Sequence, residues 1–285
     1  MNIFAVLLCI LLIAFVCRIS LRKTPRSNIS NPSVAVISAV YGGYDSPATH
    51  VPQSIPVDFF FFTDSDAHAP GYTIDKRKYH YEFRHENDTK ALNNSYELNN
   101  HTFNQAKFYK QQFHRIPCLK KYDFIIWLDG SIELTCPYAI EKTIRAMQNS
   151  KKGVLTWKHE MRNNIKAEAK ASHYHRYTSK FWNGQAQTYQ DVDKQYDEYT
   201  RDHYKDDNGL YITCMVAWDM KHPKTVATLD LWFLQTLLYT TQDQISFPYV
   251  LWKMKNAVHV LPDRSISGDK PHNSTSIFNK RAHKK

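Results

Sequence analysis

An aspartate follows the most apolar short run of the chain and is the first residue that suggests chemistry. Residues 122–134 read YDFIIWLDGSIEL, so five apolar residues precede Asp129-Gly130. A run this short predicts a strand buried on both faces. The carboxyl ends of strands in an α/β sheet face the ligand crevice, which places Asp129 to hold a metal or a phosphosugar. The alternative is that Asp129 opens a tight Asp-Gly turn into a second strand, 132–134.

Two further groups of polar residues have spacings that suit a site. His159, Arg162 and Glu168 follow a short predicted strand as H-x2-R-x5-E and would lie on neighbouring faces of a helix. The alternative for them is a surface ion pair worth less than about 1 kcal/mol. Asp243-Gln244 precede an apolar helix, where an aspartate commonly serves only as the N-cap.

Lysines and glycines supply candidate contacts for phosphate groups. Lys107 and Lys110 lie three residues apart on a helix predicted over 99–115, and a solvated helix face is the alternative. Tyr41-Gly42 follow the first predicted strand, where glycine lets the backbone approach a nucleotide but also suits an ordinary loop.

Strands and helices alternate along the chain, which predicts a three-layer α/β domain with its site at the strand ends. A segment over 187–205 is amphipathic and rich in tyrosine. Buried strands are predicted at 34–40, 57–63, 124–128, 153–157, 211–218 and 258–261, and helices at 99–115, 137–148, 222–239 and 245–254.

The net charge of +10 is concentrated near the two ends of the chain. Residues 18–26 and 280–285 each carry four basic residues and no acid, which leaves about +2 for the rest. A nucleic-acid groove needs its positive charge inside the folded domain, so no nucleic-acid partner is expected.

The N-terminus predicts membrane attachment. Residues 3–17 are uninterrupted apolar residues, and an uncleaved anchor is favoured over a cleaved signal peptide because no Ala-x-Ala site follows. We therefore expect a single-pass anchor at 1–21, a linker at 22–33, a catalytic domain at 34–275 and a basic tail at 276–285.

The orientation of that domain is argued from two opposing signals. Four basic residues after the apolar run favour a cytosolic domain by the positive-inside rule. Five glycosylation sequons favour a lumenal domain, and this is the orientation we expect. The sequons begin at Asn28, Asn87, Asn93, Asn100 and Asn273.

Taken in order, these signals resemble the glycosyltransferase-like family that includes plant turgor-regulation and seed-mucilage proteins. The resemblance spans about residues 34–255. Its ordered parts are Lys110, His114-Arg115, YDFIIWLDG, the His159/Arg162/Glu168 motif, Gly209-Leu210, Leu231-Trp232-Phe233 and Asp243-Gln244-x-Ser246-Phe247.

The resemblance implies a GT-A-like α/β/α fold with a mixed central sheet, anchored in the Golgi or a related secretory membrane. It implies transfer of a hexosyl or pentosyl group from a nucleotide-diphospho-sugar donor to a glycan or glycoprotein acceptor, and retention of the anomeric configuration is expected. A divalent cation, Mn²⁺ or Mg²⁺, is expected to stabilise the leaving diphosphate.

The resemblance also implies roles for single residues. Asp243-Gln244 look like the pair that contacts donor hydroxyls in retaining enzymes, although a general-base role for Asp243 is left open. Donor or acceptor contacts are expected from Tyr41, Gly42, Lys110, His159, Arg162, Glu168 and, in a Gly-x-x-Lys-Pro segment, Lys270. Metal ligands are expected at Asp129 with His259 or His272.

The chain departs from the family pattern at three places. Asp129-Gly130-Ser131 keeps only the first carboxylate of the usual Asp-x-Asp, and Trp218 and Gln242 stand where arginine is usual. Two alternative functions therefore remain. One is ceramide hydrolysis, an activity attached to a plant relative, and the other is a sugar-binding domain without catalysis.

Overall fold

The computed structural model describes residues 32–43, 45–77, 102–172, 189–261 and 277–281. The expected anchor, the five sequons, Lys270 and His272 lie outside these ranges. None of the helices in the described ranges is long and apolar enough to cross a membrane. The chain divides into two units, Met1–Pro32 and Ser33–Lys285, and the second is described below.

A mixed sheet forms the centre of the domain. In the described part of the chain it has seven strands in the order β3-β2-β1-β4-β7-β6-β8, and β7 runs against the other six. The predicted α/β fold with a mixed sheet is confirmed. The strands are β1 (Val34–Val40), β2 (Asp58–Thr63), β3 (Thr73–Asp75), β4 (Phe124–Leu128), β6 (Val154–Lys158), β7 (Tyr211–Asp219) and β8 (Val258–Leu261).

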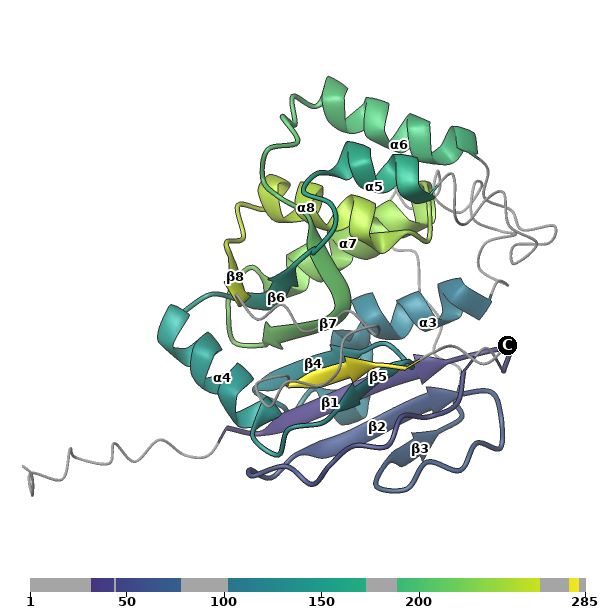
Figure 1. Ribbon diagram of the computed structural model, residues 1–285, viewed down its shortest axis with the longest axis vertical. Coiled ribbons are helices and arrows are strands. Elements are labelled where there is room, and N and C mark those ends of the chain that lie inside the picture. Colours follow the sequence, from purple (N-terminus) through teal and green to yellow (C-terminus); the bar gives the residue numbers. More distant parts are fainter. Residues whose placement is uncertain (1–31, 44, 78–101, 173–188, 262–276, 282–285) are drawn as a thin grey trace, which may run out of the picture. The chain divides into compact units, whose positions relative to one another are not determined.

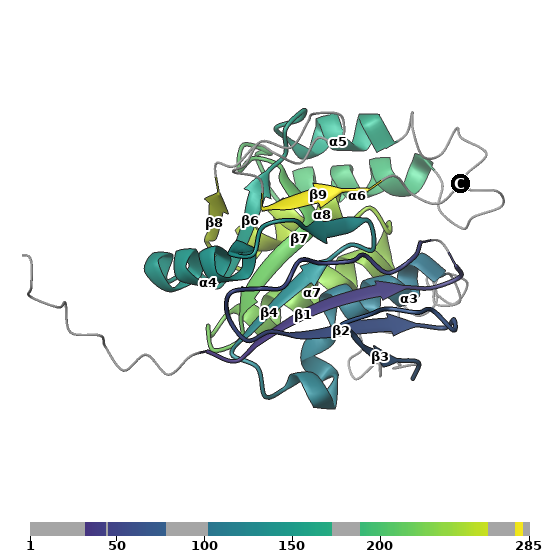
Figure 2. The same cartoon turned by 60° about the horizontal axis from the view of Figure 1, so that its bottom comes forward.

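Layers of helix cover both faces of the sheet (Figures 1 and 2). One face carries α3, α7 and α8, with α5 and α6 packed beyond them, and the other carries α4. The helices are α3 (Thr102–Gln111), α4 (Ala139–Ser150), α5 (Ile165–Ser172), α6 (Tyr189–Arg201), α7 (Thr225–Leu238) and α8 (Asp243–Lys253).

Two strands in the middle of the sheet, β1 and β4, are apolar on both sides because each of their side chains faces one of these helix layers. Successive strand residues point to opposite faces. Ile125 and Trp127 of β4 accordingly pack with the α3, α7 and α8 layer, whereas Ile126 and Leu128 pack with α4. The continuous apolar run read from the sequence is thus the signature of a strand between two cores.

A second, two-stranded sheet joins the end of the chain to the domain. β5 (Ile132–Leu134) pairs antiparallel with β9 (Phe278–Lys280). Residues 278–280 were expected to belong to a basic tail, and the structure instead places them in a strand beside β5. Arg281 follows and donates to the carbonyl oxygens of Gly130 and Ser46, at 2.8 and 2.7 Å.

Two local features differ from the sequence-based expectation. The helix predicted over 99–115 ends at Gln111, and a separate 3-10 turn, Phe113–Arg115, follows it. The short edge strand β3 was not predicted, because three residues in a polar stretch give no periodic signal.

Gly130 allows the turn after β4 to pack against β1. A methyl group added at this glycine would lie 2.6 Å from Cγ2 of Val40, which belongs to the buried strand β1. We expect Gly130→Ala to lower the free energy of unfolding by about 1–3 kcal/mol, because overpacking forces such side chains to move.

Urea denaturation of a double-mutant cycle with Val40→Ala measures this contact. Shortening Val40 makes room for the new methyl group, so the cost of Gly130→Ala should fall in that background. An equal cost in both backgrounds would contradict the packing explanation.

Candidate functional site

One edge of the sheet gathers the polar residues that the sequence singled out. β1, β2, β4 and β6 are parallel, so their carboxyl ends share this edge. Tyr41, Asp64, Asp129 and His159 follow these four strands in turn. The antiparallel β7 begins at the same edge and brings Thr213 there.

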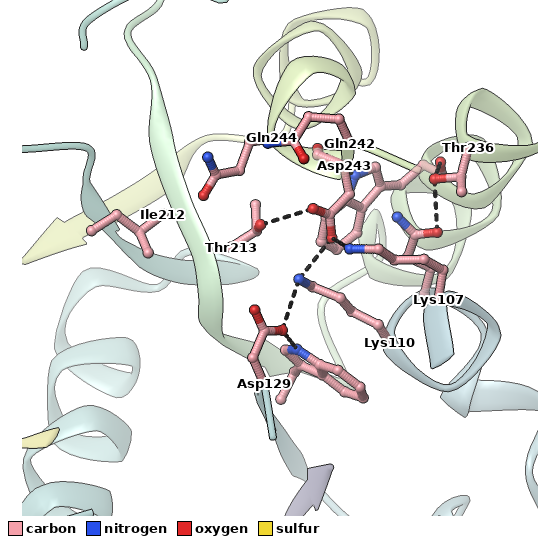
Figure 3. A network of polar contacts seen from close by, with 12 residues as sticks. Lys107, Lys110, Asp129, Ile212, Thr213, Thr236, Gln242, Asp243 and Gln244 are labelled. Carbon is pink, nitrogen blue, oxygen red and sulfur yellow. Dashed lines mark hydrogen bonds and ion pairs between the residues drawn. The ribbon is translucent and has the colours of Figure 1, made fainter. Parts of the chain in front are cut away.

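Two lysines and two aspartates form a charged cluster at this edge (Figure 3). Lys107 and Lys110 of α3 each place Nζ 2.7 Å from Oδ2 of Asp243, the first residue of α8. Nζ of Lys110 also lies 3.2 Å from Oδ1 of Asp129. Oδ1 of Asp243 accepts a hydrogen bond from the hydroxyl of Thr213 at 3.1 Å. These contacts tie α3, β4, β7 and α8 together.

Burial and mutual attraction set the charges of this cluster. The side chain of Lys110 is 1% exposed. Burial alone would raise the pKa of Asp243, but attraction from Lys107 and Lys110 outweighs it and holds that pKa well below its usual range. Burial alone would lower the pKa of Lys110, but attraction from Asp129 and Asp243 outweighs burial and raises that pKa. Burial lowers the pKa of Lys107 to about 8.

Asp129 is the most exposed member of the cluster, with 39% of its side chain accessible. Its Oδ1 also accepts a hydrogen bond from Nε1 of Trp127 at 2.6 Å. Its carbonyl oxygen accepts from the amide of Ile132, which opens the turn into β5. Asp129 therefore begins a turn and also presents a partly exposed carboxylate at the carboxyl ends of the strands.

Glu168 of α5 is the centre of a second polar cluster. Its side chain is 3% exposed, and Nε of Arg162 donates to its Oε2 at 2.5 Å. Its Oε1 accepts from the side-chain amides of Gln242 and Gln244 at 2.6 and 3.0 Å. Arg162 also contacts Nε2 of His159 at 3.0 Å, and burial lowers the pKa of that histidine.

The start of α8 joins the two clusters. Gln242 and Gln244 point to Glu168, while Asp243 between them points to Lys107 and Lys110. The predicted residues from α3, β4, α5 and α8 thus form one continuous polar region.

Three of the alternative interpretations are wrong. Asp243 is not an N-cap, because Gln242 holds that position and Asp243 bonds with α3 and β7. Lys110 does not belong to a solvated face. The pair of Arg162 with Glu168 is not a surface pair, because Glu168 is buried. The His/Arg/Glu motif lies on a loop and the following helix rather than on one helix.

Tyr41 and Gly42 lie at the same edge, but the ring of Tyr41 and the backbone amide of Gly42 already have partners. The ring of Tyr41 is buried and stacks on Tyr109, with centroids 5.3 Å apart. The amide of Gly42 donates to both carboxylate oxygens of Asp64 at 3.1 Å. A nucleotide that used this amide would have to replace Asp64.

The described residues do not by themselves fit a divalent cation. Among them, no three His, Cys, Asp or Glu side chains gather closely enough to hold one. Oδ1 of Asp129 already accepts hydrogen bonds from Lys110 and Trp127. His259 lies on β8, three strands from β4 and paired with Leu155, so it cannot share an ion with Asp129. His272 lies outside the described residues.

Sequence reasoning missed several members of the region. Lys107 was noted for its spacing from Lys110 but not chosen, and Thr213 and Gln242 were not chosen either. The Lys-x-x-Lys spacing on a helix with an apolar stripe was the available signal for Lys107. Trp218, where the family usually has arginine, packs with Trp232 in the core and does not reach the site.

The sequence matches a family described as "TOD1/MUCI70, glycosyltransferase-like domain" over residues 17–264. The chain belongs to this family. The resemblance inferred from the ordered motifs is thereby confirmed, since the match includes both polar clusters. No curated protein matches the chain significantly.

The solved structures that match this chain include two glycosyltransferases. Mouse xyloside xylosyltransferase 1, in its apo form, has a TM-score of 0.42 and 10% identity, covering 80% of this chain and 85% of its own. Core-mannan synthase A from Aspergillus fumigatus, in its Mn/GDP form, has a TM-score of 0.41 and 12% identity, covering 80% and 71%.

The lowered pKa of Lys107 gives a prediction for stability at alkaline pH. Between pH 8 and pH 10.5 the folded chain loses a proton from Lys107 that the unfolded chain keeps. The unfolded state then binds more protons, so stability rises with pH in this window. Relative to Lys107→Met, the free energy of unfolding should rise by up to about 3 kcal/mol.

Urea denaturation at several pH values checks this rise. Comparison with Lys107→Met cancels the other groups that titrate in the same window. The exposed Lys152→Met is the control, and it should follow the wild-type curve. Parallel curves for wild type and Lys107→Met would show that Lys107 keeps an ordinary pKa.

Proposed function

We propose that this protein is a glycosyltransferase with a GT-A-like fold that moves a sugar from a nucleotide-diphospho-sugar to a glycan or glycoprotein acceptor. Membership of a glycosyltransferase-like family supports the proposal. The observation that carries it is the lysine and aspartate cluster at the carboxyl edge of the sheet, where ligands of α/β folds bind.

Asp129 is proposed to face the donor. A carboxylate that is partly exposed and held by Lys110 and Trp127 can accept hydrogen bonds from sugar or ribose hydroxyls in a fixed direction. Such preorganised groups need little rearrangement as the transition state forms.

The leaving diphosphate needs positive charge, and two cations are proposed to supply it. Lys107 is 17% exposed and Arg162 is 23% exposed, so both reach the surface of the polar region. A guanidinium has five N–H donors, and the contacts of Arg162 with Glu168 and His159 leave donors for an anion.

Asp243 is proposed to position the lysines and the donor rather than to act as a base. Its carboxylate is buried, and each of its oxygens contacts a hydroxyl or an ammonium. A general base needs a pKa near the working pH, and that of Asp243 is held far below it. The low pKa of Asp243 favours a retaining mechanism over an inverting one. Gln244, the next residue, is proposed to contact the sugar.

The remaining expectations stay proposals. They are a single-pass anchor in the Golgi or a related secretory membrane, a lumenal domain, a hexosyl or pentosyl donor, and contacts by Lys270 and His272. The use of Mn²⁺ or Mg²⁺ also stays a prediction, tested by adding either ion or EDTA.

A matched pair of aspartates tests the proposed role of Asp129. Asp123 precedes β4 and pairs with Lys221 at 2.6 Å, whereas Asp129 follows β4 and pairs with Lys110. The full chain, purified in detergent, is assayed for nucleotide release from a panel of nucleotide-diphospho-sugars. We expect Asp129→Asn to lower kcat about 100-fold or more, as loss of a preorganised group does. Asp123→Asn should change it less than about threefold.

The outcomes separate the functions that were considered. Equal activity of the two variants would exclude Asp129 from the reaction. No binding of any nucleotide in calorimetry, with or without Mn²⁺, would favour a hydrolase or a non-catalytic sugar-binding domain over a transferase.

A further inference from the structure

A pocket of about 360 Å³ is lined by residues of α6, α7 and α8 and by Tyr239. Figure 1 shows these three helices on the same side of the sheet. Its size falls in the usual range of small-ligand pockets, about 300–1,000 Å³. It is lined by three tyrosines, one glutamine, two acids and two bases. None of these eight residues belongs to the polar region at the sheet edge.

Tyrosine rings form one side of the pocket. Tyr199 and Tyr249 are buried and stack in parallel, with centroids 3.7 Å apart. Tyr239, at the end of α7, lies nearly perpendicular to Tyr199 at 6.2 Å and is partly exposed. Tyr239 therefore offers an aromatic surface, against which the C–H face of a sugar ring can pack.

Charged side chains of both signs form the rest of the lining. Arg201 contacts Glu198 at 2.8 Å, and Asp202 contacts Lys253 and accepts from the hydroxyl of Tyr249 at 2.7 Å. Carboxylates accept about four hydrogen bonds and a guanidinium donates five, so these contacts leave room for ligand hydroxyls. Two acids and two bases cancel, and this favours a neutral polyhydroxyl ligand over a phosphate or a uronate.

A chain of hydrogen bonds connects the pocket with the start of α8. The backbone amide of Gln242 donates to the hydroxyl of Thr240. That hydroxyl donates to the side-chain oxygen of Gln195 at 3.1 Å. Gln195 donates to the hydroxyl of Tyr199 at 2.7 Å, and that hydroxyl donates to Gln235 at 2.9 Å. Two residues of the pocket lining, Tyr199 and Gln235, are thus linked to the segment that positions Asp243.

We propose that this pocket binds a neutral carbohydrate and serves as a remote subsite for the acceptor glycan. The carbohydrate class follows from the tyrosine wall, the polar groups and the balanced charge. The acceptor role rests on the proposed transferase function. α8 carries Asp243 at its first residue and Lys253 at its last, which are about 15 Å apart along the helix. An oligosaccharide can extend over that distance.

Binding is tested on the full chain in detergent micelles by calorimetry, without any nucleotide-sugar. The probes are hexasaccharides of glucose, xylose and mannose, with hexagalacturonate as the acidic comparison. We expect at least one neutral probe to bind more tightly than hexagalacturonate. Tyr239→Ala and Arg201→Gln should each weaken that binding at least fivefold.

Arg145→Gln is the matched control for Arg201→Gln. Arg145 is 72% exposed on α4 and pairs with Glu141, while Arg201 is 66% exposed on α6 and pairs with Glu198. The control should bind the neutral probe as the wild type does. Failure of every neutral probe to bind, tighter binding of hexagalacturonate, or equal loss in Arg145→Gln would overturn the carbohydrate assignment.

Kinetics with a nucleotide-sugar tests the acceptor role. If the pocket holds the acceptor, Arg201→Gln should raise the acceptor KM at least fivefold and leave kcat unchanged. An unchanged KM in a variant that has lost oligosaccharide binding would show a separate glycan site and overturn the acceptor role. The binding measurement needs no transfer activity, so it decides the carbohydrate assignment even if the proposed reaction fails.

Discussion

The pairing of Lys110 with Asp129 and Asp243 is the interaction on which the site depends. A fully buried ammonium costs several kcal/mol to take out of water and is tolerated only beside well-placed negative charge. Asp129 follows β4, and Asp243 begins α8. Charge as well as apolar packing therefore holds β4 and α8 in place beside α3. The positions of Asp129 and Asp243 at the carboxyl edge of the sheet therefore depend on the charge of Lys110.

The second cluster differs in charge from the pattern that the family resemblance implies, because that pattern has an arginine at position 242. Gln242 stands where arginine is usual and donates to Glu168 without adding charge. Arg162, which belongs to the His/Arg/Glu motif, is the cationic partner of Glu168. The region thus holds one fixed positive charge fewer than an arginine at position 242 would give it.

Much of the fold and several site residues could be predicted because local patterns report them. The apolar run of β4 and the ordered motifs located Asp129, Glu168 and Asp243. Burial of Lys110 could not be predicted, because the same spacing describes a solvated helix face. The capping interpretation of Asp243 failed for a related reason, since its partners lie more than 100 residues away in α3. β9 was missed because three residues in a basic stretch carry no periodicity.

The pairing of β5 with β9 brings the last described residues beside the turn that follows β4. Arg281 holds the carbonyl of Gly130, and its own amide donates to Ser131 at 2.7 Å, so this arginine fastens the turn that begins at Asp129. A variant without the Arg281 side chain would lose the bond to the Gly130 carbonyl. That loss would loosen the turn whose carboxylate is proposed to meet the donor.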